Sequence, residues 1–224
     1  MRPVYARSVT EREILIDARG AALAGDLSVP DGARGVVTFA HGSGSSRHSP
    51  RNRAVATAMQ QRGFATLLMD LLTEDEERQE ARAGHQGFDI ELLAQRLAAA
   101  IDGLPSLAPG LPIGLFGAST GAAAALAAAA VRPAIGAVVS RGGRPDLAGD
   151  VLGDVSAPTL LIVGARDDQV LELNRQAMSR MRCQVSLEIV PGAAHLFEEP
   201  GALEEVSRLA GDWFELAVGF EPTT

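Results

Sequence analysis

Six short apolar segments recur along this chain, and most of them are apolar at consecutive positions, instead of at every second or every third to fourth position. Strands that are buried on both faces of a sheet show this pattern. The segments are residues 36–40, 65–69, 113–116, 135–139, 159–163 and 185–190. Stretches with helical periodicity separate them, and this alternation predicts a mostly parallel sheet covered by helices on both faces.

The remaining segments extend this α/β pattern. Residues 13–29 alternate between polar and apolar side chains around a central turn, which predicts an antiparallel hairpin before the first buried strand. Ser49 and Asp89 each precede a stretch with helical periodicity and are expected to cap it. Further helices are expected at about 169–181 and 200–216. Together these elements predict a sheet of about eight strands.

Composition and charge narrow the class of protein. The 224 residues fit a single domain with its core at about residues 12–216, and a hydrophobic content of 46% is ordinary for a soluble protein. The net charge of −8 disfavours nucleic acids and anionic membranes as partners. Cys183 is the single cysteine, so no internal disulfide is expected. Because no apolar run resembles a signal peptide or a membrane span, we expect a cytoplasmic protein.

The segment Gly117-Ala118-Ser119-Thr120-Gly121 places a serine between two glycines, where a predicted strand ends and a helix begins. A sharp turn at such a junction imposes unusual backbone angles on the serine and brings strand and helix so close that their neighbours must be small. The hydroxyl is then held above the carboxyl edge of the sheet, near a helix N-terminus that stabilises negative charge. Ser119 is therefore the candidate nucleophile.

A serine nucleophile needs a general base and an acid that orients the base, and after a turn of this kind they follow in the order acid, then histidine. His195 is the one histidine after Ser119, and it lies in a loop between the last predicted strand and the last helix. Asp167 and Asp168 follow the strand at 159–163. We assign Asp167 as the acid because it leaves the turn first, whereas Asp168 can cap the next helix. Asp168 remains the alternative.

Two backbone N–H groups are needed to stabilise the oxyanion of an acyl-transfer intermediate. One is expected from Thr120, which follows the nucleophile. The other is expected from the glycine- and serine-rich loop that begins at His41, with Ser43 as the first choice and Gly44 as the next. His41 itself is expected to be a buried, hydrogen-bonded histidine that braces this loop.

The His41 loop, the Ser119 elbow, the turn before Asp167 and the His195 loop together resemble the dienelactone hydrolase-like branch of the α/β-hydrolase superfamily, over about residues 12–216. This resemblance implies the α/β-hydrolase fold with little or no lid over the site. Dienelactone hydrolases proper carry cysteine where this chain has serine. Hydrolysis of a dienelactone is therefore not implied, and a serine at that position is more similar to a general carboxylesterase.

The connection at residues 141–157 begins at the carboxyl end of a predicted strand, which is the edge where folds of this type bind ligands. Arg141 and Arg144 lie at its start and are candidates to bind a carboxylate or phosphate on the substrate. The alternative for either residue is an ion pair with a neighbouring acid such as Asp146. The connection is short, so the site is expected to be open to solvent.

These residues predict a serine hydrolase that cleaves a small ester, of carboxylesterase or lactonase type, through an acyl-enzyme. A thioesterase, amidase or acyltransferase on the same triad is the alternative within catalysis, and a non-catalytic ligand-binding protein of the same fold is the alternative outside it. No cofactor and no metal are expected, because no histidine–cysteine cluster has ligand spacing. The expected partner is a small-molecule ester, with no nucleic acid and no membrane, and the chain is expected to be a monomer or a homodimer.

Overall fold

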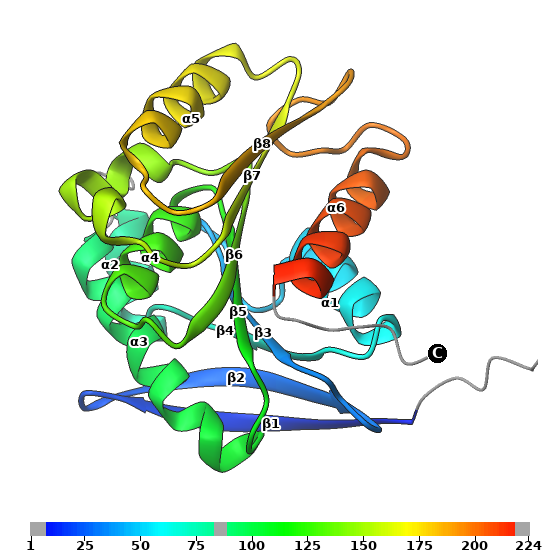
Figure 1. The fold of residues 1–224 in the computed structure, drawn as a ribbon. Helices are drawn as coiled ribbons and strands as arrows, with labels where there is room; N and C mark the ends of the chain where they lie inside the picture. Colours follow the sequence, from blue (N-terminus) through cyan, green and yellow to red (C-terminus); the bar gives the residue numbers. More distant parts are fainter. Residues whose placement is uncertain (1–7, 83–88, 218–224) are drawn as a thin grey trace, which may run out of the picture.

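The computed structural model of this chain describes residues 8–82 and 89–217, and its centre is one eight-stranded sheet (Figure 1). The strand order is β1-β2-β4-β3-β5-β6-β7-β8. The strands are β1 Val9–Ala18, β2 Ala21–Pro30, β3 Val36–Ala40, β4 Ala65–Met69, β5 Ile113–Ala118, β6 Ile135–Arg141, β7 Thr159–Gly164 and β8 Val185–Val190. All pairs among β3 to β8 are parallel, which confirms the predicted mostly parallel sheet.

The N-terminal hairpin is present as predicted. Strands β1 and β2 pair antiparallel with Ala18 opposite Ala21, and the two residues of the turn, Arg19 and Gly20, both have positive φ. Two-residue turns of this kind match the twist of the flanking strands. Strand β2 then pairs antiparallel with β4, so the hairpin continues the parallel part of the sheet at one edge.

Helices cover both faces of the sheet. In Figure 1, α1 and α6 lie on one side, and α3, α4 and α5 lie on the other. The helices are α1 Pro50–Gln61, α2 Glu74–Arg82, α3 Ile90–Leu107, α4 Thr120–Ala130, the 3₁₀ segment η1 Pro145–Asp154, α5 Asp168–Arg180 and α6 Ala202–Ala217. The two predicted N-caps are confirmed, because Ser49 Oγ accepts the N–H of Asn52 and Asp89 Oδ1 accepts the N–H of Leu92.

The two faces are packed differently. The α4 side has a core of small and aliphatic residues, with six alanines of α4 fully or almost fully buried against β3 and β5. The α1 and α6 side contains the aromatic residues of the core: Phe39, Phe64, Phe116, Phe197 and Phe214. The small residues let α4 approach the sheet closely, and this close approach determines the position of the loop that precedes the helix.

The connections between the strands differ in length. Between β6 and β7 the chain forms only the η1 segment, as expected of a short connection, whereas the chain between β4 and β5 carries both α2 and α3. None of the helices within residues 8–82 and 89–217 is long and apolar enough to cross a membrane.

Candidate active site

Ser119 occupies a strained turn between β5 and α4. Its backbone has φ 53° and ψ −123°, a conformation that residues other than glycine rarely adopt. Strand and helix are so close here that a Cβ on Gly117 would lie 2.4 Å from the Cα of Ala122. The predicted sharp turn is therefore present, and its glycine is required by the close approach.

Neighbouring loops fix this turn through the backbone. The N–H of Ser119 donates to the carbonyl of Arg141 at 3.2 Å, and the carbonyl of Ser119 accepts from the N–H of Arg144 at 3.0 Å. A Cβ on Gly42 would lie 2.9 Å from the Cβ of Ser119. The loops after β3 and β6 thus pack directly against the serine.

His195 and Asp167 are joined by a short hydrogen bond. The Nδ1 of His195 lies 2.6 Å from Oδ2 of Asp167, and the Asp167 side chain is only 15% exposed. Asp167 stands at the N-cap position of α5 without capping it, because its carboxylate contacts the histidine. The expectation that Asp168 caps this helix is wrong, since Asp168 is the first residue of the helix and is exposed to solvent.

A second ion pair joins the two loops that carry these residues. Arg166 in the Asp167 turn pairs with Glu199, and the Glu199 carboxylate also accepts the N–H of Ala194 at 3.1 Å. Backbone N–H groups, and then Arg166, hold the pKa of Glu199 below its usual value. Sequence reasoning did not identify Arg166 and Glu199, because neither belongs to a motif and their contact is visible only once the loops are placed.

Ser119 and His195 line the same small cavity, of about 180 Å³, at the carboxyl ends of β3, β5 and β6. The residues that line it are Gly42, Ser43, Ser45, Ser49, Arg51, Asn52, Ala118, Ser119, Arg141, Gly142, His195 and Leu196. Gly142 has a φ of 49°, and a Cβ there would lie 3.7 Å from Cε1 of His195. The cavity wall therefore combines Ser119 and His195 with two arginines, and there is no aspartate or glutamate among these residues.

The two candidate arginines differ in their surroundings. Arg144 makes a two-pronged contact with Asp146, at 2.9 and 2.8 Å, and this is the ion pair that the sequence left open as an alternative. Arg141 ends β6, is 7% exposed and lines the cavity of Ser119. Only Arg141 is thus in a position to face a molecule bound beside the serine.

Ser43 and Thr120, the two candidate oxyanion donors, lie side by side. The N–H of Ser43 donates to the hydroxyl oxygen of Thr120 at 2.9 Å, and the two hydroxyl oxygens are 2.9 Å apart. Thr120 is the first residue of α4, where N–H groups have no partner within the helix. Of the two, Ser43 lines the cavity, and its N–H is directed at Thr120 in this structure.

His41 has the bracing role that its sequence context suggested. Its Nε2 accepts the N–H of Leu71 at 3.1 Å, so Nδ1 carries the proton and donates to the carbonyl of Gly42 at 3.0 Å. Burial lowers the pKa of this histidine. Asp70 and Glu77 lie close enough to complete a metal-ligand set, but both nitrogens of His41 are occupied and Asp70 pairs with Arg47, so we assign no metal here.

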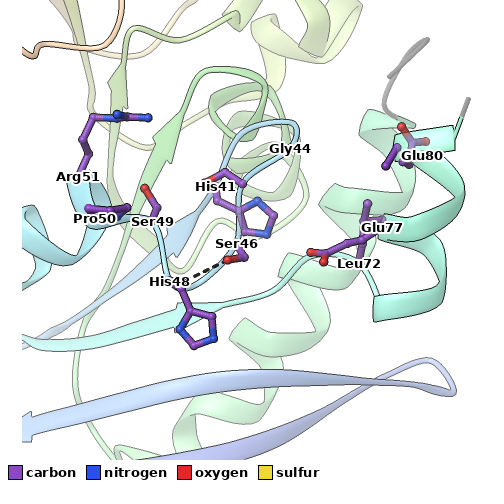
Figure 2. Close-up of a pocket in the computed structure, with 12 residues that line it drawn as sticks. His41, Gly44, Ser46, His48, Ser49, Pro50, Arg51, Leu72, Glu77 and Glu80 are labelled. Carbon is purple, nitrogen blue, oxygen red and sulfur yellow. Dashed lines mark hydrogen bonds between the residues drawn. The ribbon is translucent and has the colours of Figure 1, made fainter. Parts of the chain in front are cut away.

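A larger cavity of about 580 Å³ adjoins the first and shares Ser45, Ser49 and Arg51 with it. Figure 2 shows the loop that follows β3 on one side of this cavity and α2, with Glu77 and Glu80, on the other. A substrate held at Ser119 therefore has room to extend between the loop and α2.

Comparison with known proteins places this arrangement in a family. Residues 33–208 match the family described as "Alpha/beta hydrolase domain". The crystal structure of a dienelactone hydrolase from Anabaena variabilis is 52% identical, with a TM-score of 0.90, and the match covers 93% of this chain and 98% of that one. The chain belongs to the dienelactone hydrolase-like α/β-hydrolases. Membership of this family supports hydrolase activity for this chain.

Other similar proteins differ in length or share only the fold. A Mycobacterium tuberculosis protein, provisionally named a phosphoribosyl transferase, is 59% identical over 208 residues, which are 91% of this chain and 46% of that protein. This chain thus spans about half the length of the curated relatives that it matches. Est1E from Butyrivibrio proteoclasticus has a TM-score of 0.77 at 18% identity, over 92% of this chain and 99% of that one, which shows a common fold.

Proposed function

We propose that this chain is a serine hydrolase that cleaves a small ester through an acyl-enzyme on Ser119. The observation that carries the proposal is the hydrogen bond between Nδ1 of His195 and Oδ2 of Asp167, which are 2.6 Å apart. The same histidine lines the cavity of Ser119, whose backbone is strained. Asp167 then fixes the ring so that Nδ1 donates to the carboxylate, which leaves Nε2 as the base. The family membership supports the same chemistry class.

In the proposed mechanism, Nε2 of His195 takes the Ser119 proton as Oγ attacks the ester carbonyl. The tetrahedral oxyanion is stabilised by the N–H of Thr120 and the N–H of Ser43, which turns from the Thr120 hydroxyl to the substrate. His195 then gives the proton to the leaving alcohol, and water, activated by the same histidine, releases the acid. Asp167 stabilises the imidazolium in both steps.

The size of the site favours a small acyl group. A cavity of about 180 Å³ is below the range of about 300–1,000 Å³ that is usual for drug-sized ligands. The adjoining cavity of about 580 Å³ leaves more room for the alcohol part. A short acyl ester of carboxylesterase or lactonase type fits these dimensions best.

The test is hydrolysis of p-nitrophenyl acetate and butyrate by the wild type, by Ser119→Ala and by Ser207→Ala. Ser207 is a matched control because its hydroxyl donates to the carbonyl of Leu203 within α6, and it does not line the cavity of Ser119. We expect Ser119→Ala to lower kcat by at least about 10⁴-fold and Ser207→Ala to leave it unchanged. Equal activity of the wild type and Ser119→Ala would exclude the proposed nucleophile.

The wild type and the same two variants also distinguish two alternative functions. A thioesterase, an amidase or an acyltransferase uses the same three residues, so it would show a preference for a thioester, an amide or an acceptor alcohol over water. A non-catalytic binding protein would turn over none of these. The name phosphoribosyl transferase belongs to relatives of about twice this length, and the matching half is accounted for by the hydrolase domain, so we do not extend that activity to this chain.

A further inference from the structure

A buried positive charge in the cavity of Ser119 has no counter-ion among the residues that the structure describes. Arg141 is 7% exposed, and its Nη2 has one long hydrogen bond, 3.5 Å from Oδ1 of Asn52. Its Nε and Nη1 are buried without any hydrogen-bond partner. A guanidinium carries five N–H donors, so most of the hydrogen-bonding capacity of this side chain is unused within the described part of the chain.

Such an arrangement is unfavourable for the protein alone. A buried charge is costly unless it is paired, and the second arginine at the cavity, Arg51, repels it. Burial and, to a smaller extent, Arg51 lower the pKa of Arg141 to about 10, so the side chain is still charged at neutral pH. The ring of Phe197, 5.9 Å from the guanidinium carbon, offsets only part of the cost.

The surroundings indicate what would complete the site. Arg51, Arg141 and His195 all line this cavity, and no aspartate or glutamate of the described residues does so. Arg51 pairs with Glu198 outside the cavity, at 3.2 Å, so Arg141 is the arginine whose charge is left unpaired there. The protein as a whole has a net charge of −8, so the positive character is local to this cavity. A planar guanidinium with free N–H groups matches the oxygens of a carboxylate or phosphate.

We propose that Arg141 is a specificity residue that binds an anionic group, a carboxylate or a phosphate, on the ester that is cleaved at Ser119. This inference rests on the proposed function and names its substrate class. The carbonyl of Arg141 accepts the N–H of Ser119, so the backbone fixes the arginine relative to the nucleophile. In a cavity of about 180 Å³ the anionic group must then lie within a few bonds of the ester carbonyl.

Three methyl esters of the same length test this inference. Methyl pentanoate is neutral, monomethyl glutarate ends in a carboxylate, and methyl 4-phosphonobutanoate ends in a phosphonate that stands for a phosphate. The kcat/KM of each is measured by proton release for the wild type, Arg141→Met, Arg141→Lys and Arg132→Met. Arg132 is the control, because it pairs with Asp102 and does not line the cavity.

We expect the wild type to prefer one anionic ester to methyl pentanoate by at least about tenfold, the scale of one charge-assisted contact. Arg141→Met loses that preference, so that the ratio of its kcat/KM on the anionic ester to its kcat/KM on methyl pentanoate falls to about one. Arg141→Lys retains part of the preference, and Arg132→Met retains all of it. The anionic ester with the higher kcat/KM shows whether the site prefers a carboxylate or a phosphate.

Binding provides a readout that does not need turnover. Glutarate or inorganic phosphate at millimolar concentration is expected to raise the Tm of the wild type and not that of Arg141→Met, and this result supports the anion site even if no ester is cleaved. Equal rates on all three esters, without any such rise in Tm, overturn the inference while the serine mechanism stands. A uniform loss on all three esters in Arg141→Met, with a lower Tm, overturns it in favour of a structural role. Loss of the preference in Arg144→Met instead assigns the anion to the other arginine.

Discussion

Two arginines of this chain are equally buried and have opposite surroundings. Arg96 in α3 is 6% exposed, and its guanidinium contacts both carboxylate oxygens of Glu76, at 2.6 and 2.7 Å, and the carbonyl of Leu71 at 2.9 Å. Arg141 at the end of β6 is 7% exposed and has no carboxylate partner in the described residues. The charge of Arg96 is paired within the fold and joins α2 to α3. The charge of Arg141 is available to the anionic substrate group that we propose.

Among the described residues, the histidines His41 and His195 differ in the same way. His41 uses both ring nitrogens for backbone contacts and has no capacity left for chemistry. His195 uses Nδ1 for Asp167 and is 40% exposed at the cavity. The region around His41 and Arg96 is therefore complete in itself, and the cavity around Ser119 keeps polar groups available.

The sharpest test of the cavity region uses two adjacent aspartates. Asp167→Asn is expected to lower kcat/KM for a p-nitrophenyl ester by about 10³–10⁴-fold, because the histidine loses the carboxylate that sets its tautomer. Asp168→Asn, one residue further on, is expected to change it by less than about threefold, since that side chain is exposed and has no contact with His195. The reverse order would assign the acid to Asp168.

The free energy of unfolding distinguishes the roles of Arg96 and Arg141. Arg96→Met is expected to lower the free energy of unfolding by roughly 2–3 kcal/mol, because the carbonyl of Leu71 and the partly exposed carboxylate of Glu76 both lose their partner. Arg141→Met is expected to leave this free energy unchanged or to raise it, because an unpaired buried charge is removed. Urea titrations of both variants measure the difference, and equal losses in the two would contradict the comparison.

The loop after β3 packs closely against the elbow at Gly42, and a substitution there can disturb this packing. In Gly42→Ala the new Cβ would lie 2.9 Å from the Cβ of Ser119 and 3.1 Å from the carbonyl of Ala118, so the serine must shift. We expect kcat/KM to fall by about 10- to 100-fold with little loss of stability. Gly103→Ala is the control, because a Cβ there meets nothing within 4 Å. Full activity in Gly42→Ala would show that the elbow tolerates displacement.

Acid should weaken the ion pair between Arg96 and Glu76. The hydrogen bonds from Arg96 hold the pKa of Glu76 at about 2 instead of 4.5, against the opposing effect of burial. Stability from this pair is fully present above about pH 4.5 and is lost as the pH falls toward 2. The Glu76 side chain is 35% exposed, so solvent screening limits the loss to about 1–2 kcal/mol. Glu76→Gln should be less stable at neutral pH and should lack this pH dependence, which unfolding at several pH values will show.

Local sequence was sufficient for most of the fold and for the order of the candidate triad. Six strands were visible as apolar runs, five of them buried and β8 partly exposed at the edge of the sheet, and the Ser119 elbow was visible because one pentapeptide contains the whole turn. Asp167 and His195 followed from chain order, since each comes directly after a strand of the same parallel sheet.

Contacts between distant loops and helices could not be predicted in the same way. Nothing near Arg141 in the sequence shows that it lacks a carboxylate, because this depends on α1, which brings Asn52 and Arg51 to the cavity. The direction of the Ser43 N–H likewise depends on a side-chain conformation of Thr120. Asp168 was expected to cap α5 because a cap is judged from position alone, and the structure places Asp167 there instead.

The most direct measurement is the site of covalent labelling by a fluorophosphonate, read by mass spectrometry of the intact protein and of its peptides. We predict one adduct on Ser119, absent from Ser119→Ala and formed more slowly in Asp167→Asn. An unlabelled wild type, or an adduct on another serine such as Ser43 or Ser45, would contradict the proposal that Ser119 is the nucleophile.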